Sequence, residues 1–133
     1  MSEENVEIVR RLASFWQNRD YSLVEEICHP DAVVDVSRNV FNPGVYSGID
    51  GLRSFMGSID DAWESFDLVP EEYIDAGDCV VMANRISGRG RASGVKTEML
   101  VFAVVALEGG RVVRFTGGYR DREEALEAAG LSG

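Results

Sequence analysis

The sequence has few residues that could carry out nucleophilic or metal-dependent chemistry. Its one histidine, His29, stands before a proline at a predicted helix end, where a cation complements the helix dipole. The serines therefore have no free histidine to act as their base. The two cysteines, Cys28 and Cys79, form no CxxC motif and are expected as buried free thiols. We expect neither a metal site nor a cofactor.

One polar side chain lies within an otherwise apolar predicted strand. Asn84 shares a face of the segment Cys79–Gly88 with Met82 and Ile86. A buried amide needs a hydrogen-bond partner. Asn84 is therefore predicted to bind either another part of the protein or a ligand.

Further candidates flank the end of the first predicted strand, Ala32–Val36. Asp35 and Arg38 are close enough in sequence to form an ion pair, and the alternative is that Arg38 contacts an anionic or carbonyl group of a ligand. Tyr46 follows in the long predicted loop Ser37–Gly48, and long loops in compact domains are often functional. Arg38 and Tyr46 are predicted ligand contacts.

The elements that must position these residues begin with three predicted helices. The first is amphipathic, with Val9, Leu12, Ala13 and Trp16 on one face. A short second helix ends before Pro30, because proline disfavours helical geometry in the residue before it. The third covers Gly51–Trp63.

Long strands make up most of the remaining sequence. Alternation and turn signals predict strands over Phe66–Asp75, Cys79–Gly88, Val95–Leu107 and Arg111–Tyr119, followed by a short C-terminal helix capped by Asp121. Helices first and a strand meander afterwards predict a single α+β domain over residues 1–133, with helices packed on one face of an antiparallel sheet.

The net charge of −10 bears on the class of partner. Acidic surfaces repel phosphates, so we expect no nucleic-acid and no membrane partner. The amino terminus is acidic, unlike a signal peptide, and the longest apolar run, Met99–Leu107, is too short for a membrane helix. A cytoplasmic location is expected.

The run Met99–Leu107 is apolar on both faces of the predicted strand. One face can meet the helices, and the other also needs a cover. We predict a homodimer through the outer sheet face.

Three stretches resemble the nuclear transport factor two-like superfamily, and SnoaL-like domains within it. They are "IVRRLASFWQNRDYSLVEEICHPDAVVDV" at Ile8–Val36, "YSGIDGLRSFM" at Tyr46–Met56 and "EGGRVVRFTGGYRDREEALEAAGL" at Glu108–Leu131. The superfamily includes ketosteroid isomerase and polyketide cyclases. The resemblance implies a cone of curved sheet and helices around an apolar pocket that takes a small apolar ligand.

The resemblance also implies which aromatic side chains line the pocket. Trp16, Phe55, Trp63, Phe115 and Tyr119 fall on the elements that enclose it in the family. The alternative is that they are ordinary core residues at helical or strand spacing.

The catalytic groups of ketosteroid isomerase are replaced in this sequence. By the resemblance, the position of that enzyme's base falls at Val36. The position of its oxyanion tyrosine falls near Leu12 and that of its protonated acid near Ala103. Asp35, one residue before the base position, is the predicted catalytic residue. It reaches the pocket only if a bulge turns it inward, and is otherwise an exposed strand carboxylate.

Two functions of different classes follow. The first is a cofactor-independent isomerase, cyclase or dehydratase-type lyase acting on a small apolar cyclic metabolite, with Asp35 as general base. The second is a non-catalytic ligand-binding or dimeric interaction protein with the same fold.

Overall fold

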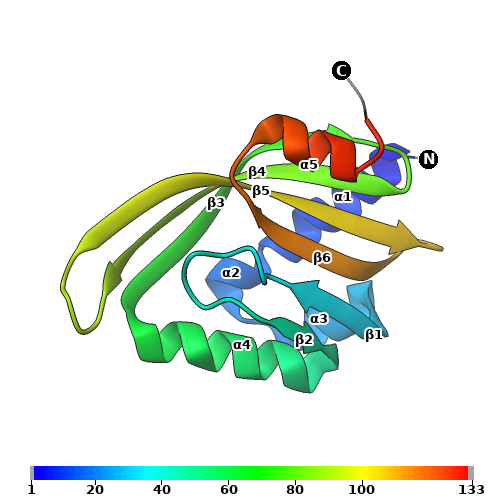
Figure 1. Ribbon diagram of the computed structural model, residues 1–133. Coiled ribbons are helices and arrows are strands. Elements are labelled where there is room, and N and C mark those ends of the chain that lie inside the picture. Colours follow the sequence, from blue (N-terminus) through cyan, green and yellow to red (C-terminus); the bar gives the residue numbers. More distant parts are fainter. Residues whose placement is uncertain (1, 132–133) are drawn as a thin grey trace.

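Short helices form the first part of the chain in the computed structural model, which describes residues 2–131 (Figure 1). The first predicted helix is divided in two, α1 (Ser2–Ala13) and α2 (Phe15–Asn18). At the break, the Ser14 hydroxyl donates to the Arg11 carbonyl oxygen at 2.7 Å, a local bond that competes with regular helix. The break sets α2 apart as a separate turn that carries Trp16.

The next elements join the helices to the sheet. Helix α3 (Tyr21–Ile27) is capped by Asp20, whose carboxylate accepts hydrogen bonds from two backbone N–H groups. Strand β1 (Cys28–Asp35) follows without a loop, and β2 (Val45–Ser47) leads into α4 (Gly48–Ala62). Strand β2 lies inside the segment that the sequence predicted as a loop, and α4 begins three residues before its predicted start.

Long strands complete the sheet. They are β3 (Trp63–Asp75), β4 (Cys79–Gly90), β5 (Lys96–Glu108) and β6 (Arg111–Tyr119), and the chain continues into α5 (Arg122–Ala128). The predicted strand meander and C-terminal helix are therefore confirmed. Asp121 caps α5, as predicted, by accepting a hydrogen bond from the Glu123 N–H.

The sheet has the strand order β2-β1-β6-β5-β4-β3. All neighbours are antiparallel except β1 and β6, which are parallel. The α+β class with a curved sheet is confirmed, and the expectation of a fully antiparallel sheet is corrected at this one pair. The correction has a topological cause, because the first strand returns to the sheet beside the last one.

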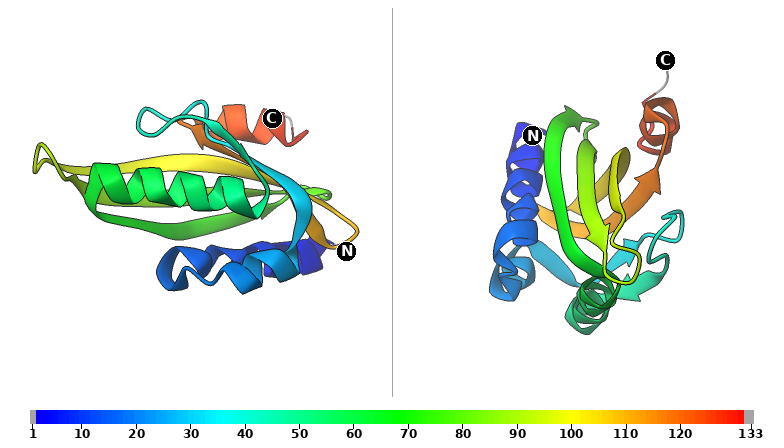
Figure 2. Two further views of the ribbon diagram at one scale, coloured as in Figure 1. Left: turned by 90° about the horizontal axis from the view of Figure 1, so that it is seen from below. Right: turned by 90° about the vertical axis from the view of Figure 1, so that its left-hand side faces the viewer.

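Helices cover the sheet on both faces, not on one as predicted. Figure 2 shows α1 and α5 on opposite sides of the sheet. On the inner face, Val9 and Ala13 of α1 pack with Met82 and Val105. No helix among residues 2–131 is both long and apolar enough to cross a membrane.

The outer face is covered by the chain's own α5. Val81, Phe102 and Val104 form a buried cluster there with Tyr119 and Ala125. Part of the second apolar face of β5, at Phe102 and Val104, therefore has a cover within the same chain, whereas Leu100 on that face is exposed. This weakens the argument from which the homodimer was predicted, and the homodimer stays a prediction.

A bulge in β6 determines which face Tyr119 occupies. Thr116 pairs with Val104 and Tyr119 pairs with Phe102, so β6 has an extra residue over this stretch. Gly117 and Gly118 lie within it, and Gly118 has a φ of 87°, which favours glycine. The bulge turns Tyr119 to the outer face, whereas Phe115 stays on the inner face.

Candidate functional site

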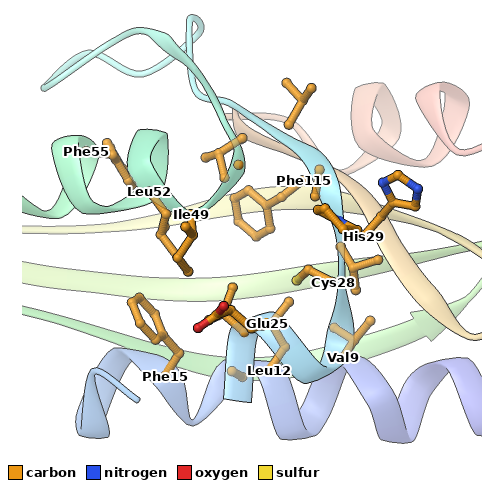
Figure 3. Close-up of a pocket in the computed structure, with 18 of the residues that line it drawn as sticks. Val9, Leu12, Phe15, Glu25, Cys28, His29, Ile49, Leu52, Phe55 and Phe115 are labelled. Carbon is orange, nitrogen blue, oxygen red and sulfur yellow. The ribbon is translucent and has the colours of Figure 1, made fainter. Parts of the chain in front are cut away.

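An apolar cavity, called cavity one, lies between the helices and the inner face of the sheet. Its volume is about 250 Å³. Leu12 of α1, Phe15 of α2, Leu52 and Phe55 of α4 and Phe115 of β6 are among its walls (Figure 3). Each of these elements therefore contributes its apolar face to a shared chamber.

The walls of cavity one are almost entirely apolar. The ionisable lining groups are Glu25, Cys28 and His29, and of these Glu25 and His29 are exposed to solvent. Their exposure marks the mouth of the cavity, between α3, the start of β1 and the start of α4. Such a chamber favours an apolar molecule, because polar groups placed inside would find few partners.

The inner wall carries a thiol in its neutral form. Burial raises the pKa of Cys28 to about 11, and the nearby Arg111 charge opposes this only partly. Cys28 and Cys79 are both free, as predicted, but they are half-buried and not buried. A neutral, half-buried thiol behaves as a small apolar wall group, so Cys28 does not make cavity one polar.

His29 is oriented by its own backbone. Its Nδ1 atom accepts a hydrogen bond from the Asp31 N–H at 3.0 Å. The ring thus bonds forward along β1, and not back to the helix carbonyls as a helix-end cation would. Because Nδ1 accepts, Nε2 carries the proton of the neutral ring.

A smaller chamber, called cavity two, lies further along the inner face and has a volume of about 70 Å³. The loop after β1 covers it with Asn39, Val40, Phe41 and Asn42. Trp16, Phe55 and Phe115 line both cavities. These three aromatic side chains form the partition between the two chambers.

Trp63 anchors the loop over cavity two. Its indole Nε1 donates to Asn42 Oδ1 at 3.0 Å, and Asn42 Nδ2 donates to the Ser58 carbonyl oxygen at 3.0 Å. The Phe41 ring lies edge-on to Trp63, with 5.2 Å between ring centroids. Both polar ends of the Asn42 amide are thus engaged within the protein.

Asn84 differs from Asn42 because its amide oxygen is not engaged by any residue that the structure describes. It is 1% exposed and lines cavity two, on the same face as Ile86, as predicted. Its Oδ1 atom is buried and has no hydrogen-bond partner among residues 2–131. Leaving such an oxygen unsatisfied costs about 1–3 kcal/mol.

Of the predicted ligand contacts, Trp16, Trp63 and Asn84 line a cavity, and Arg38, Tyr46 and Tyr119 do not. Tyr119 belongs to the outer cluster beside α5, for the reason given by the β6 bulge. Arg38 lies beside Tyr119 on the outer face. Its guanidinium lies 4.5 Å from the centre of the Tyr119 ring and 3.1 Å from the Glu124 carboxylate.

Tyr46 packs behind the wall of cavity one. Its ring centroid lies 5.2 Å from that of Phe55, and it belongs to the same apolar cluster. Tyr46 therefore supports a lining residue. The predicted aromatics Phe55 and Phe115 do line the cavities, while also packing in the core.

Asp35 lies outside both cavities, on the other side of β1 from Val36. Its carboxylate accepts a hydrogen bond from the Ser37 hydroxyl at 2.7 Å and one from the Arg114 guanidinium at 2.7 Å. The Ser37 hydroxyl and N–H, followed by Arg114, lower the pKa of Asp35. No bulge turns this carboxylate inward, so its position is that of the strand carboxylate that simple alternation predicts. A base in the pocket needs contact and a pKa nearer neutrality, and Asp35 has neither.

The residues that sequence reasoning missed are Glu25 and the mouth position of His29. Glu25 is outside the apolar set of α3 by spacing, yet it borders cavity one. The adjacent apolar residue Val24 also lines the cavity. The available signal was the spacing of the two residues. Glu25 and His29 are four positions apart at a helix–strand junction, so two polar groups come close together there.

No group of three or more metal-binding side chains is found among residues 2–131. The geometry of the site is that of an apolar chamber with a polar mouth and a smaller neighbouring chamber.

This fold and pocket define the class to which the molecule is most similar. The chain belongs to the SnoaL-like domain family, whose sequence pattern it matches over residues 9–115. None of the curated protein sequences matches it.

Solved structures extend the comparison to the whole fold. A nuclear transport factor two-like protein from Burkholderia pseudomallei has a TM-score of 0.76 at 21% identity, covering 93% of this chain and 95% of that chain. A putative SnoaL-like polyketide cyclase from Jannaschia has a TM-score of 0.73 at 21% identity, covering 87% and 85%. TerC, co-crystallised with polyporic acid, has a TM-score of 0.75 at 18% identity, covering 96% and 98%. These likenesses show the fold.

The family positions of ketosteroid isomerase can now be located. Val36, where the resemblance places the base, and Ala103, near the acid position, both line cavity two, and Leu12, near the tyrosine position, lines cavity one. All three side chains are apolar. These three residues therefore supply no proton-transfer group.

Proposed function

We propose that this chain is a small-molecule binding protein that holds a small, largely apolar, cyclic molecule in cavity one. The observation that carries the proposal is a chamber of about 250 Å³ with apolar walls and a mouth bordered by Glu25 and His29. Non-catalytic binding is preferred over catalysis because Asp35 lies outside the chamber with a lowered pKa.

The size of the chamber limits the ligand. An engineered apolar cavity of about 150 Å³ in another protein takes up benzene. Cavity one is larger, at about 250 Å³, and accommodates one ring with short substituents or a compact two-ring molecule. The walls select apolar over charged ligands, because they offer few partners for a charge.

The solved neighbours support this ligand class. One was co-crystallised with polyporic acid, and others are described as putative polyketide cyclases. Those names concern other proteins that share the fold, and they are consistent with small organic ligands in this architecture.

The experiment compares ligand binding in the wild type and in a plugged variant. Ring compounds of graded size are screened by thermal shift and then measured by calorimetry. Ligand at 100 times its Kd stabilises the fold by about 2.7 kcal/mol. Leu52, half-buried on α4, lines cavity one, and Leu52→Trp places an indole there. We expect at least a tenfold loss of affinity.

The matched control is Leu126→Trp, at a half-buried leucine of the outer cluster. It adds the same side chain away from cavity one, so affinity should stay within about threefold of the wild type. Equal affinity of the Leu52→Trp variant and the wild type would exclude cavity one as the binding site. Absence of binding by any ring compound would reject the proposal altogether.

A second function, acid–base turnover, is favoured by one observation. Glu25 and His29 both line the mouth of cavity one and are able to transfer protons. The test uses any compound that binds. Product formation that is lost in Glu25→Gln or His29→Gln, with Kd unchanged, would support catalysis. If the wild type bound the compound and formed no product, turnover would be rejected and the binding function would stand.

A further inference from the structure

Two aspects of cavity two are unlike the rest of the inner face. The chamber contains a buried amide oxygen with no partner among residues 2–131, and it adjoins cavity one through a shared partition. The partition consists of Trp16, Phe55 and Phe115. A molecule held in cavity one thus lies next to the chamber that contains the free acceptor.

The surroundings of Asn84 do not require a polar side chain. Its partners on the neighbouring strands are Val101 of β5 and Pro70 of β3. Its neighbours on the inner face of β4, Met82 and Ile86, are also apolar. A leucine or valine would therefore fill the position without an unsatisfied oxygen, so packing alone does not account for asparagine here.

The other polar residues that line the chamber are less buried than Asn84: Asn39, Asn42 and Thr97 are half-buried and Arg120 is exposed. Of these, Asn42 is committed to the protein. Asn42 accepts from the Trp63 indole and donates to the Ser58 carbonyl. It is half-buried, whereas Asn84 is 1% exposed. Asn84 is therefore a fully buried polar group of cavity two whose oxygen is left for a ligand to meet.

We propose that cavity two is the polar subsite of the ligand site, in which Asn84 receives a hydroxyl group of the molecule whose ring occupies cavity one. The volume of about 70 Å³ is too small for a ring and sufficient for a hydroxyl on a short arm, since a water molecule takes about 30 Å³. A hydroxyl both donates and accepts, so it matches either end of the Asn84 amide. The inference rests on the function proposed above.

The partition determines how such a molecule fits. The Trp16 ring lies 6.5 Å from the Phe55 ring, edge to face, and 5.7 Å from the Phe66 ring. Trp16 is half-buried on the four-residue helix α2, which is held to α1 by the Ser14 turn. The proposal therefore includes a reorientation of the Trp16 side chain, through which the short arm passes from cavity one into cavity two.

The experiment uses a matched pair of probes, propylbenzene and 3-phenyl-1-propanol, which differ by one terminal hydroxyl. Calorimetry gives the Kd of each for the wild type, Asn84→Leu and Ile74→Val. Ile74 is the control because it is a half-buried apolar residue beside the outer cluster and lines neither cavity. We expect the wild type and Ile74→Val to bind the alcohol about tenfold more tightly than the hydrocarbon, which corresponds to about 1.4 kcal/mol. Asn84→Leu should lose this preference and keep its Kd for propylbenzene within about threefold.

The outcomes separate this inference from the function on which it rests. Binding of propylbenzene with no preference for the alcohol in the wild type, or with a preference that survives in Asn84→Leu, overturns the subsite and leaves the binding function intact. Binding of neither probe rejects both.

Thermal unfolding provides a second readout. Asn84→Leu removes an unsatisfied oxygen, so its melting temperature should equal or exceed that of the wild type. A fall of several degrees would show that Asn84 is satisfied by structural water, and would also overturn the proposal.

Discussion

The inner and outer faces of the sheet are both apolar, but they are covered in different ways. On the outer face, Phe102, Val104 and Tyr119 pack against α5 in one buried cluster. On the inner face, α1 to α4 stand further apart and leave the two cavities. Apolar alternation in a strand thus predicts that a side chain is buried. It does not predict whether the covering helix packs closely or encloses a chamber.

The largest expected effect is a loss of stability at the outer face that leaves ligand binding at the inner face unchanged. Tyr119→Ala should remove about 3–5 kcal/mol from the free energy of unfolding, as for other buried aromatic residues, because the ring fills the space under α5. Urea unfolding measures this. Calorimetry on the folded variant should show an unchanged Kd for a ligand in cavity one.

Tyr119→Phe is the control, because it keeps the ring and should cost less than about 1.5 kcal/mol. A loss of ligand affinity in Tyr119→Ala comparable to that in Leu52→Trp would contradict the account. It would return Tyr119 to the pocket, where the sequence predicted it.

A smaller effect is expected at the edge of the outer face. Asp35→Asn weakens the contacts to Ser37 and Arg114 and should cost about 1 kcal/mol at neutral pH. The pKa of Asp35 is lowered in the folded state. Its contribution is therefore complete above its unfolded pKa of about 3.9 and is lost as the pH falls through the lower folded value.

Urea unfolding at pH 7 and at acidic pH tests whether the stabilisation by Asp35 is lost as the pH falls. The difference between the wild type and Asp35→Asn should shrink as the pH is lowered, and ligand affinity should not change at pH 7. If Asp35→Asn lowered the ligand affinity more than the free energy of unfolding, this carboxylate would belong to the site after all.

Most of the fold could be predicted because its signals are local. Helical spacing in Val9, Leu12 and Ala13 and alternation in the long strands each specify one element. The parallel pairing of β1 with β6 and the three-residue strand β2 escaped prediction. Both depend on which distant strand comes to lie alongside, and three residues are too few to show a period.

The site was predictable only where alternation holds. Asn84 lies on the predicted face because β4 is regular at that point. Tyr119 was placed in the pocket by the family resemblance, and the bulge at Gly117 and Gly118 turns it to the outer face instead. The adjacent glycines were the available signal, since glycine within a strand often marks a bulge. Glu25 was missed because its spacing on α3 does not show that it lines the cavity beside Val24.

The two cysteines lie on opposite faces and allow the most direct test of the central claim. Cys28 lines cavity one, and Cys79 packs beside the outer cluster. Burial raises the pKa of both thiols, that of Cys28 to about 11, so both should react slowly with iodoacetamide at pH 8 and faster as the pH rises.

The decisive measurement is the rate of modification at each cysteine, followed by mass spectrometry, with and without a saturating ring ligand. If the ligand occupies cavity one, Cys28 should react at least tenfold more slowly in its presence, and the rate at Cys79 should stay the same. An unchanged rate at Cys28 with ligand bound would contradict the account, because the ligand would then occupy some other part of the molecule.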